Sequence, residues 1–202
     1  TCKEPYTLGK GDIKVALYDF GAKNNIAASL VKRGCEVTVY PASTLASTVL
    51  EGNYDGIMLS NGPGDPAECV DIIKQMQILM KSGTPIFAIC LGHQLMALAH
   101  GFETEKLKYG HHGANHPVKD LDTNQVYIST QNHNYVVKED TIDPSIARPW
   151  FKNVNDGTIE GVEYLKENIK TVQFHPEACA GPLDTNYLFD EFIKMMGGNK
   201  NA

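Results

Sequence analysis

The sequence predicts an α/β protein: a parallel sheet with helices on both faces, plus antiparallel β additions in the C-terminal half. Between residues 13 and 101, apolar β-rich runs alternate with segments of helical periodicity. This alternation is typical of a parallel sheet whose connecting helices cover both faces. The runs are continuous, as expected for strands buried on both sides. After residue 101, β-rich runs separated by polar turns predict the antiparallel additions.

The N-terminal half is expected to hold four strand–helix pairs. In the first helix Ile26, Leu30 and Val31 lie on one face, and Gly34 ends the helix. The helix after the second strand has the weakest pattern of the four. The predicted strands are 13–21, 35–41, 54–60 and 84–90, and the predicted helices are 23–34, 44–50, 67–83 and 91–101.

The C-terminal half is predicted from two β-rich segments and one helix. Residues 125–137 and 158–177 are rich in strand-forming side chains and contain polar turns. The chain then carries an apolar helical stripe, for which Asp184 or Thr185 is the expected N-cap. The stripe consists of Leu188, Phe189, Phe192, Ile193 and Met196.

The composition argues against nucleic-acid binding and against insertion into a membrane. The 202 residues are 42% hydrophobic and 21% charged, as in an ordinary globular protein. A net charge of −6 leaves no broad basic surface, so we expect no nucleic-acid partner. No apolar stretch approaches the roughly 20 residues of a membrane helix, so no membrane partner is expected. Five scattered cysteines without a C-x-x-C pair favour a reduced, cytoplasmic setting.

The first twelve residues, TCKEPYTLGKGD, read as a linker because they contain Pro5, Gly9 and Gly11. The chain also begins without a methionine. We therefore expect residues 1–12 to be a linker that follows a missing N-terminal domain. Residues 13–202 show no internal repeats, which predicts that they form one domain.

Cys90 stands where an apolar run ends and a helical pattern begins, in the stretch FAICLGHQLMALAHG. Ligands of open α/β sheets bind beyond the carboxyl ends of the strands. Small residues at Ala88 and Gly92 allow a tight strand-to-helix elbow that pushes the thiol outward. The helix N-terminus favours an anion, and a thiolate is the competent nucleophile. A buried structural cysteine is the alternative, and position alone does not decide between them.

Two remote segments complete a possible active site. In VQFHPEA, His175 follows an apolar run and Glu177 lies two residues on, so the carboxylate can orient the imidazole as in a triad. In NGPGDP, residues 61–66, Gly62 and Gly64 flank Pro63, and the backbone N–H groups of such a turn can stabilise an oxyanion beside Cys90. Taken singly, His175 can be a core histidine and NGPGDP a plain turn.

The three segments NGPGDP, CLGHQ and HPE together resemble the class I, triad-type glutamine amidotransferases, over roughly residues 14–196. Within that family the sequence is most similar to the glutaminase domain of the carbamoyl-phosphate synthetase small chain. That likeness lies in LYDFGAKNNI, YGHHGANHPV, TQNHNY and GPLDTNYLFDEF. The resemblance implies a flavodoxin-like fold. It also implies hydrolysis of L-glutamine to glutamate and ammonia, through a γ-glutamyl thioester.

The resemblance also implies roles for single residues. Cys90 is the expected nucleophile, His175 the base and then the acid, and Glu177 the group that orients His175. The N–H groups of Gly62 and Leu91 are the expected oxyanion donors. The expected glutamine-binding residues are Gly62, Gly64, Leu91, Gln94, Asn132, Asn134 and Tyr135.

The implied partners are L-glutamine, the missing N-terminal domain of the small chain, and the carbamoyl-phosphate synthetase large subunit. No cofactor is expected in this domain, and ATP and magnesium are expected only on the synthetase. A metal at His111, His112 and His116 is conceivable, but no cysteine or carboxylate completes it at suitable spacing, so we expect none. Cys179, just beyond HPE, lacks the strand–helix corner and is not expected to be the nucleophile.

Two positions depart from the family pattern. Ala88 replaces a usual glycine, and because alanine is small we expect the elbow to survive. Asn134 replaces a glycine in QNHNY, and we expect it at positive φ, which asparagine tolerates.

Two other functions are weighed: a non-catalytic partner-binding module of the same fold, and another cysteine γ-glutamyl hydrolase. The intact Cys90, His175 and Glu177 oppose the first, and GHHGANHPV opposes the second.

Overall fold

The structure is a computed structural model that describes residues 1–178 and 181–197. Within them, one sheet has the strand order β1-β3-β2-β4-β5-β10-β9-β8-β6-β7. The strands are β1 (Tyr6–Leu8), β2 (Ile13–Asp19), β3 (Cys35–Pro41), β4 (Gly56–Leu59), β5 (Ile86–Ile89), β6 (Thr104–Asp120), β7 (Val126–Val137), β8 (Ala147–Asn153), β9 (Ile159–Tyr164) and β10 (Ile169–Val172). The α-helices are α1 (Asn24–Val31), α2 (Ala46–Glu51), α3 (Val70–Leu79), α4 (Leu91–Ala99) and α5 (Leu188–Met195).

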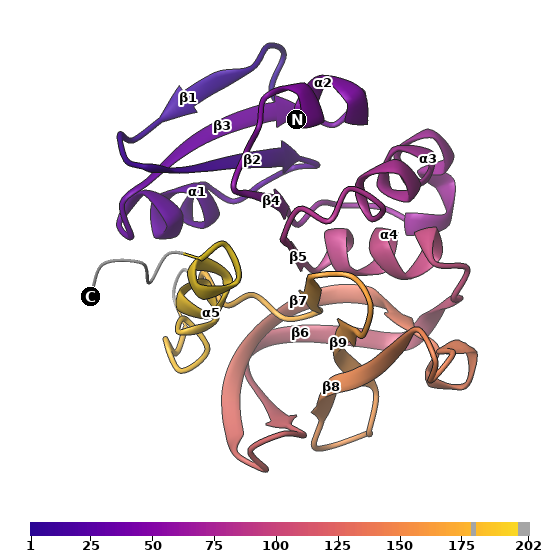
Figure 1. Cartoon of the computed structure of the whole chain (residues 1–202). Helices are drawn as coiled ribbons and strands as arrows, with labels where there is room; N and C mark the ends of the chain where they lie inside the picture. The colour runs from indigo at the N-terminus through magenta and orange to yellow at the C-terminus, as the bar shows by residue number, and fades with distance from the viewer. Residues whose placement is uncertain (179–180, 198–202) are drawn as a thin grey trace.

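The predicted fold class is confirmed by the pairing of the strands. β3, β2, β4 and β5 lie side by side and run parallel. β9, β8, β6 and β7 pair antiparallel and form the curved extension in the lower half of Figure 1. The carboxyl ends of β4 and β5, which carry the two candidate loops, therefore lie at one edge of the sheet.

Helices cover both faces of the parallel strands, as predicted (Figure 1). On one face Leu30 of α1 and Phe192 of α5 belong to one buried apolar cluster. On the other face Val49 of α2, Leu79 of α3 and Leu95 of α4 belong to a second cluster. Both faces of the sheet are covered in this way, and β4 and β5 are buried at every residue, as their continuously apolar sequences predict. β3 instead alternates between buried and half-buried residues. None of the described helices is long and apolar enough to cross a membrane.

One strand departs from the predicted topology. Residues 158–177 were expected to be wholly antiparallel, but β10 pairs parallel with β5 and antiparallel with β9. The strand can do so because it is buried on both faces, with Thr171 and Val172 fully enclosed. β10 thus joins the two halves of the sheet, and the chain leaves it at the same edge as Cys90.

Three strands were not predicted. β1 lies within the expected linker of residues 1–12 and pairs antiparallel with β3. β6 is polar and contains Gly110, Gly113 and Pro117, which hide its strand character from the sequence. Its pairing with β7 is interrupted by register shifts, as bulged strands allow. β8 carries the buried Trp150 and Phe151, and no strand was predicted for its residues.

The expected N-cap of the last helix is wrong. α5 begins at Leu188 with Tyr187 as its cap residue, and no side chain caps it. The N–H of Leu188 donates instead to the carbonyl of Thr185, and that of Phe189 donates to the carbonyl of Asn186. Backbone turns thus satisfy the first N–H groups, so neither Asp184 nor Thr185 is needed for that purpose.

Candidate active site

Cys90 occupies the sharp corner between β5 and α4. Its backbone has φ 54° and ψ −103°, a conformation that is strained for any residue but glycine. The corner is tight because a Cβ on Gly92 would lie 2.7 Å from the carbonyl oxygen of Leu59. Ala88 is fully buried and accommodated, so the elbow survives this departure from the family pattern, as predicted. A strained elbow of this kind is typical of a nucleophile presented beyond a strand end.

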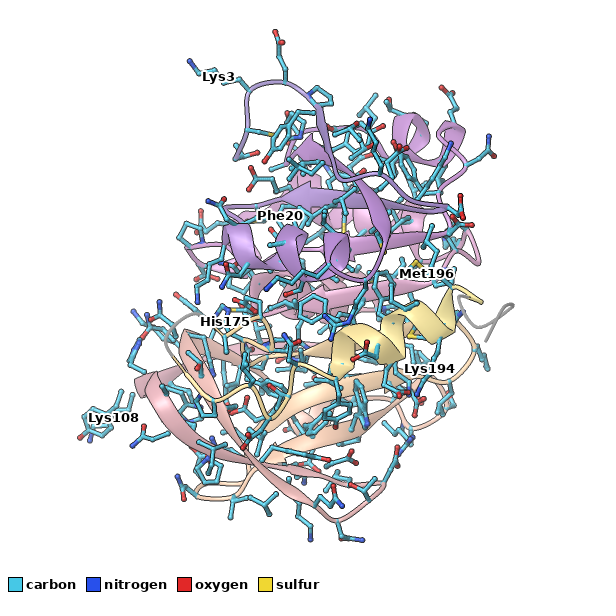
Figure 2. All side chains as sticks on the ribbon, turned by 90° about the vertical axis from the view of Figure 1, so that its left-hand side faces the viewer. Lys3, Phe20, Lys108, His175, Lys194 and Met196 are labelled. Atoms are coloured by element: carbon cyan, nitrogen blue, oxygen red, sulfur yellow. The ribbon has the colours of Figure 1, made fainter. Side chains whose placement is uncertain are left out.

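His175 lies on the segment that follows β10, and its ring is held at one nitrogen. Figure 2 shows His175 where the purple N-terminal strands meet the yellow C-terminal segment. Its Nδ1 lies 2.7 Å from Oε1 of Glu177, and both side chains are buried. A carboxylate only accepts here, so Nδ1 carries the proton that joins them. The Nε2 atom has no hydrogen-bond partner in residues 1–178 and 181–197.

The charge state of His175 is set by its neighbours. Burial by itself would lower its pKa, but the neighbouring Cys90 side chain and the Glu177 carboxylate raise it to about 9. Lys23 approaches Glu177 from the other side, with Nζ 3.6 Å from Oε1. At neutral pH the ring is therefore an imidazolium between the sulfur and the carboxylate, which suits a group that must later donate a proton.

Cys90 and His175 both line one cavity of about 470 Å³, a size that fits a small ligand. Most of the expected glutamine-binding residues line it too, and Leu91 and Glu177 do not. Glu177 lies behind His175, where an orienting group is needed, and Leu91 begins α4 next to Cys90. The expected residues on the cavity wall are Gly62, Gly64, Cys90, Gln94, Asn132, Asn134, Tyr135 and His175.

The NGPGDP loop is fixed against the elbow. The carbonyl of Ser60 accepts from the N–H of Gly92 at 3.1 Å, and its hydroxyl accepts from the N–H of Phe20 at 3.0 Å. A Cβ on Gly62 would lie 2.5 Å from the carbonyl oxygen of Phe20, so only glycine fits there. The N–H groups of Gly62 and Leu91 make no backbone–backbone hydrogen bond within the described chain. Both are therefore available to a ligand atom.

Gln94, one turn after Cys90, uses its amide nitrogen within the protein. Nε2 donates to the carbonyl of Tyr135 at 2.8 Å and to Oε1 of Gln173 at 2.9 Å. Both amide hydrogens are thereby committed, so Oε1 is the atom that Gln94 can offer to a ligand. Gln94 thus presents an acceptor at the cavity wall.

The expected positive φ of Asn134 is wrong. In the described chain the non-glycine residues at positive φ are Asn53, Cys90 and Asn124, and Asn134 lies within the extended β7. Its Oδ1 lies 3.2 Å from Nε2 of His112, an interaction that a glycine could not make. The side chain is thus used across the β6–β7 pair, and the backbone needs no left-handed turn.

The sequence reasoning missed several residues that line the cavity. Lys23 and Asn61 are the most informative, because the N–H of Lys23 donates to Oδ1 of Asn61 at 3.0 Å and ties the two loops together. Lys23 could have been found in LYDFGAKNNI, and His133 between the expected Asn132 and Asn134. The additional lining residues are Gly21, Lys23, Asn61, Pro63 and His133.

The three histidines considered as a metal site in the sequence are not the ones that converge in the structure. His112 is exposed and His116 is half-buried, whereas His111 is buried and faces Glu160 and Asp156. The hydrogen bond to Glu160 is the main cause that raises the pKa of His111 to about 9. Burial lowers the pKa of His133 to about 3. The residues that converge are His111, His133 and Glu160, a different set from the triplet weighed in the sequence.

The other cysteines stand apart from the cavity. Cys35 is buried and Cys2 and Cys69 are half-buried, and none of the three lines the wall around Cys90. Burial raises the pKa of the Cys35 thiol to about 11, which leaves it protonated and unreactive. Cys179 lies outside the described residues.

Comparisons with a family model and with curated relatives point to the same kind of protein. The model of the family described as glutamine amidotransferase class-I matches residues 16–195. The carbamoyl phosphate synthase small chain of Neisseria meningitidis serogroup A is 48% identical over an alignment of 216 residues that covers all of this chain and 57% of the relative. The small chain of Photorhabdus laumondii is 53% identical over 182 residues, covering 90% of this chain and 47% of the relative. The chain thus spans about half the length of these relatives.

Solved structures share the fold at low identity. A protein from Thermoplasma acidophilum, provisionally described as one component of a GMP synthase, matches with a TM-score of 0.80 and 21% identity, covering 93% of this chain and 96% of that one. A glutamine amidotransferase from Thermotoga maritima matches with a TM-score of 0.68 and 16% identity, covering 94% and 86%. The family model spans the parallel strands, the Cys90 elbow and the His175–Glu177 pair, and the chain belongs to the class I glutamine amidotransferase family.

Proposed function

We propose that this chain is the glutaminase part of a carbamoyl-phosphate synthetase small chain, which hydrolyses L-glutamine and supplies ammonia to the synthetase large subunit. The observation that carries the proposal is that the strained Cys90 elbow lines the same cavity as His175. Nδ1 of His175 is held by the buried carboxylate of Glu177. Nucleophile, base and orienting group are then in the order that covalent acyl transfer requires.

In the first half-reaction the Cys90 thiolate attacks the side-chain carbonyl carbon of glutamine. A carbon–sulfur bond forms, and the negative charge moves to the carbonyl oxygen. The N–H groups of Gly62 and Leu91 stabilise this oxyanion, and each such donor is worth about 10²–10³-fold in rate. The carbon–nitrogen bond then breaks, and ammonia leaves with a proton from Nε2 of His175. A γ-glutamyl thioester remains on Cys90.

In the second half-reaction water replaces ammonia. His175, now neutral, accepts a proton from water as the oxygen attacks the thioester carbon. The carbon–sulfur bond breaks, glutamate leaves, and the thiolate and imidazolium are restored. Glu177 never touches the substrate, because it lies behind the ring. Its role is to hold the Nδ1–H tautomer and to stabilise the imidazolium in both halves.

The α-amino acid end of glutamine needs one acceptor and one cation. Oε1 of Gln94 is the acceptor that suits the α-ammonium group, since its amide nitrogen is already used. Among the described residues of the cavity wall, Lys23 is the one lysine or arginine, and its ammonium group suits the α-carboxylate. Gly64, Asn132, Asn134 and Tyr135 complete the wall of this subsite.

The setting of the domain follows from the same proposal. Residues 13–202 act as the glutaminase domain, and residues 1–12 link it to a preceding domain of the small chain. The relatives are about twice as long, which supports such a domain. Residues that assemble an ATP site are expected on the large subunit, with its magnesium, and the glutaminase reaction itself uses no cofactor. The whole assembly is expected to be cytoplasmic.

The test is release of glutamate and ammonia from L-glutamine by the protein as it occurs, with and without the synthetase large subunit. Cys90→Ser is expected to abolish both products, while the matched control Cys69→Ser keeps them. Glutamine binding without hydrolysis, even with the large subunit present, would identify a non-catalytic module. Hydrolysis of γ-glutamyl peptides in preference to glutamine would identify another γ-glutamyl hydrolase.

A further inference from the structure

A cluster of three buried side chains lies beside the glutamine cavity and takes no part in the proposed chemistry. It consists of His111 on β6, His133 on β7 and Glu160 on β9. One nitrogen or oxygen of each residue lies within 4.8 Å of the others. All three residues are at least nine-tenths buried, with exposed fractions of 7%, 5% and 0%.

Each histidine of the cluster is held from outside by an oxygen. Nε2 of His111 lies 2.7 Å from Oδ2 of Asp156, and Nδ1 of His133 lies 2.9 Å from the carbonyl oxygen of Tyr135. Because both oxygens can only accept, the proton on each of these nitrogens points outward. The other nitrogen of each ring, Nδ1 of His111 and Nε2 of His133, then faces inward. Metal-ligating histidines are held in this way, by a carboxylate or a backbone carbonyl.

The inward side of the cluster brings electron-pair donors together, and the amide Nδ2 of Asn153 donates to one of them, Oε1 of Glu160, at 3.1 Å. Oε1 of Gln131 lies 2.9 Å from Nδ1 of His111 and 2.8 Å from Nε2 of His133. Oε1 of Glu160 lies 3.2 Å from the same His111 nitrogen. Oε2 of Glu160 has no hydrogen-bond partner in the described part of the chain. A buried carboxylate oxygen without a partner is costly, and a cation at this point would relieve it.

We propose that His111, His133 and Glu160 bind a divalent transition-metal ion of the zinc type. Two imidazole nitrogens and one carboxylate oxygen are a donor set that suits zinc and cobalt, whereas magnesium and calcium prefer oxygen alone. The fourth position belongs to Oε1 of Gln131 or to water. Binding uses the lone pair of Nδ1 of His111, while Nε2 keeps its proton toward Asp156.

The proposed site differs from the His111, His112 and His116 set that was considered in the sequence. His112 is exposed, and its ring nitrogens face Asn132 and Asn134. His116 is half-buried, and its Nε2 lies 3.2 Å from the carbonyl oxygen of His112. The proposed ligand His133 also lines the glutamine cavity. The carbonyl of Tyr135, which holds His133, also accepts from Gln94. A bound ion would therefore lie directly behind the substrate wall.

The test is a titration of the whole protein with Co²⁺ and then Zn²⁺, in a Cys90→Ser background that removes the active-site thiolate. We expect one cobalt ion per chain, a visible absorption spectrum of nitrogen and oxygen ligation, and displacement by zinc. Glu160→Gln keeps the shape of the side chain and should weaken binding at least about 10-fold, because a ligand is lost. The matched control His112→Gln, at an exposed position, should leave binding unchanged.

Three results would overturn the proposal. These are no stoichiometric cobalt binding, a spectrum dominated by thiolate ligation, or binding that Glu160→Gln does not weaken. Circular dichroism of Glu160→Gln separates a lost ligand from a lost fold. If that variant does not fold, His133→Gln replaces it in the same titration. The test reads metal binding alone, so its outcome is independent of whether the chain hydrolyses glutamine.

Discussion

The Nδ1 atom of His175 lies 2.7 Å from Oε1 of Glu177, and both side chains are buried. This contact fixes the ring so that its other nitrogen is directed away from the carboxylate and has no partner in the described chain. In the proposed mechanism that free nitrogen exchanges protons with ammonia and with water. Glu177 therefore affects the rate of the reaction without contacting the substrate, because it orients the ring of His175.

Replacing Glu177 should slow the reaction without abolishing it. In Glu177→Gln the ring loses its charged partner but keeps a hydrogen-bonding neighbour, so kcat should fall by up to about 10⁴-fold, the scale of general acid–base assistance. Cys90→Ala should lose hydrolysis entirely, because no covalent intermediate can form. Steady-state glutamate release measures both. Equal losses in the two variants would mean that Glu177 is not merely an orienting group.

The pH profile should report the raised pKa of His175, which is about 9. Above that pH the imidazolium loses the proton that ammonia needs, so kcat/KM for glutamine should decline on the alkaline side near pH 9. In Glu177→Gln this decline should begin at lower pH, by about one unit or more, because an opposite charge is removed. A decline that does not move in the variant would assign it to another group.

The same pKa has a consequence for stability. The folded-state pKa of His175 is about 9 and its ordinary value is 6.5, so the protonated ring stabilises the folded protein. That stabilisation is complete below about pH 6.5 and disappears as pH rises through about 9. Urea unfolding of the parent and of His175→Asn, measured across this range, should show the difference in free energy of unfolding shrink as pH increases. A constant difference would contradict the pKa.

Gly62 should tolerate no side chain. A Cβ there would lie 2.5 Å from the carbonyl oxygen of Phe20, so Gly62→Ala must move the loop and its N–H group. We expect kcat to fall about 10²–10³-fold, as for loss of one oxyanion donor. Gly161→Ala is the matched control, since its Cβ would lie 3.0 Å from Thr171 and Phe151 but outside the cavity. If both lose activity only in proportion to unfolded protein, Gly62 has no role in the oxyanion site.

Lys23 should affect binding of glutamine more than its conversion. Loss of a charge-assisted hydrogen bond of about 1.5–3 kcal/mol corresponds to a KM raised roughly 10- to 100-fold. Lys23→Gln should show this with a smaller change in kcat, while Lys74→Gln, exposed on α3, should behave as the parent. A change confined to kcat would mean that Lys23 acts through Glu177, whose Oε1 lies 3.6 Å from its Nζ.

The parallel half of the fold could be predicted because its signal is local. Continuous apolar runs and helical periodicity stand in the sequence itself, and burial on both faces leaves little freedom. β6 could not be found in this way, because its side chains are largely polar and two glycines and a proline interrupt it. Its existence depends on pairing with β7 and β8, which is a tertiary property.

The residues of the candidate site likewise fall into those found in local motifs and those that only the fold brings to the cavity. Cys90, His175 and Glu177 lie in short motifs whose chemistry is readable from residue types. Lys23 and His133 reach the cavity only because the fold brings β2 and β7 to the edge where β5 ends. The error at Asn134 has the same origin, because its side chain is used across the strand pair by His112.

The central claim is that Cys90 forms a covalent bond with the side-chain carbonyl group of glutamine. The most direct measurement is labelling with a glutamine-analogue electrophile, followed by peptide mass spectrometry of every cysteine. We predict modification of Cys90, protection by excess L-glutamine, and no labelling in Cys90→Ser. Modification of another cysteine with Cys90 untouched, or labelling that glutamine does not prevent, would contradict the account.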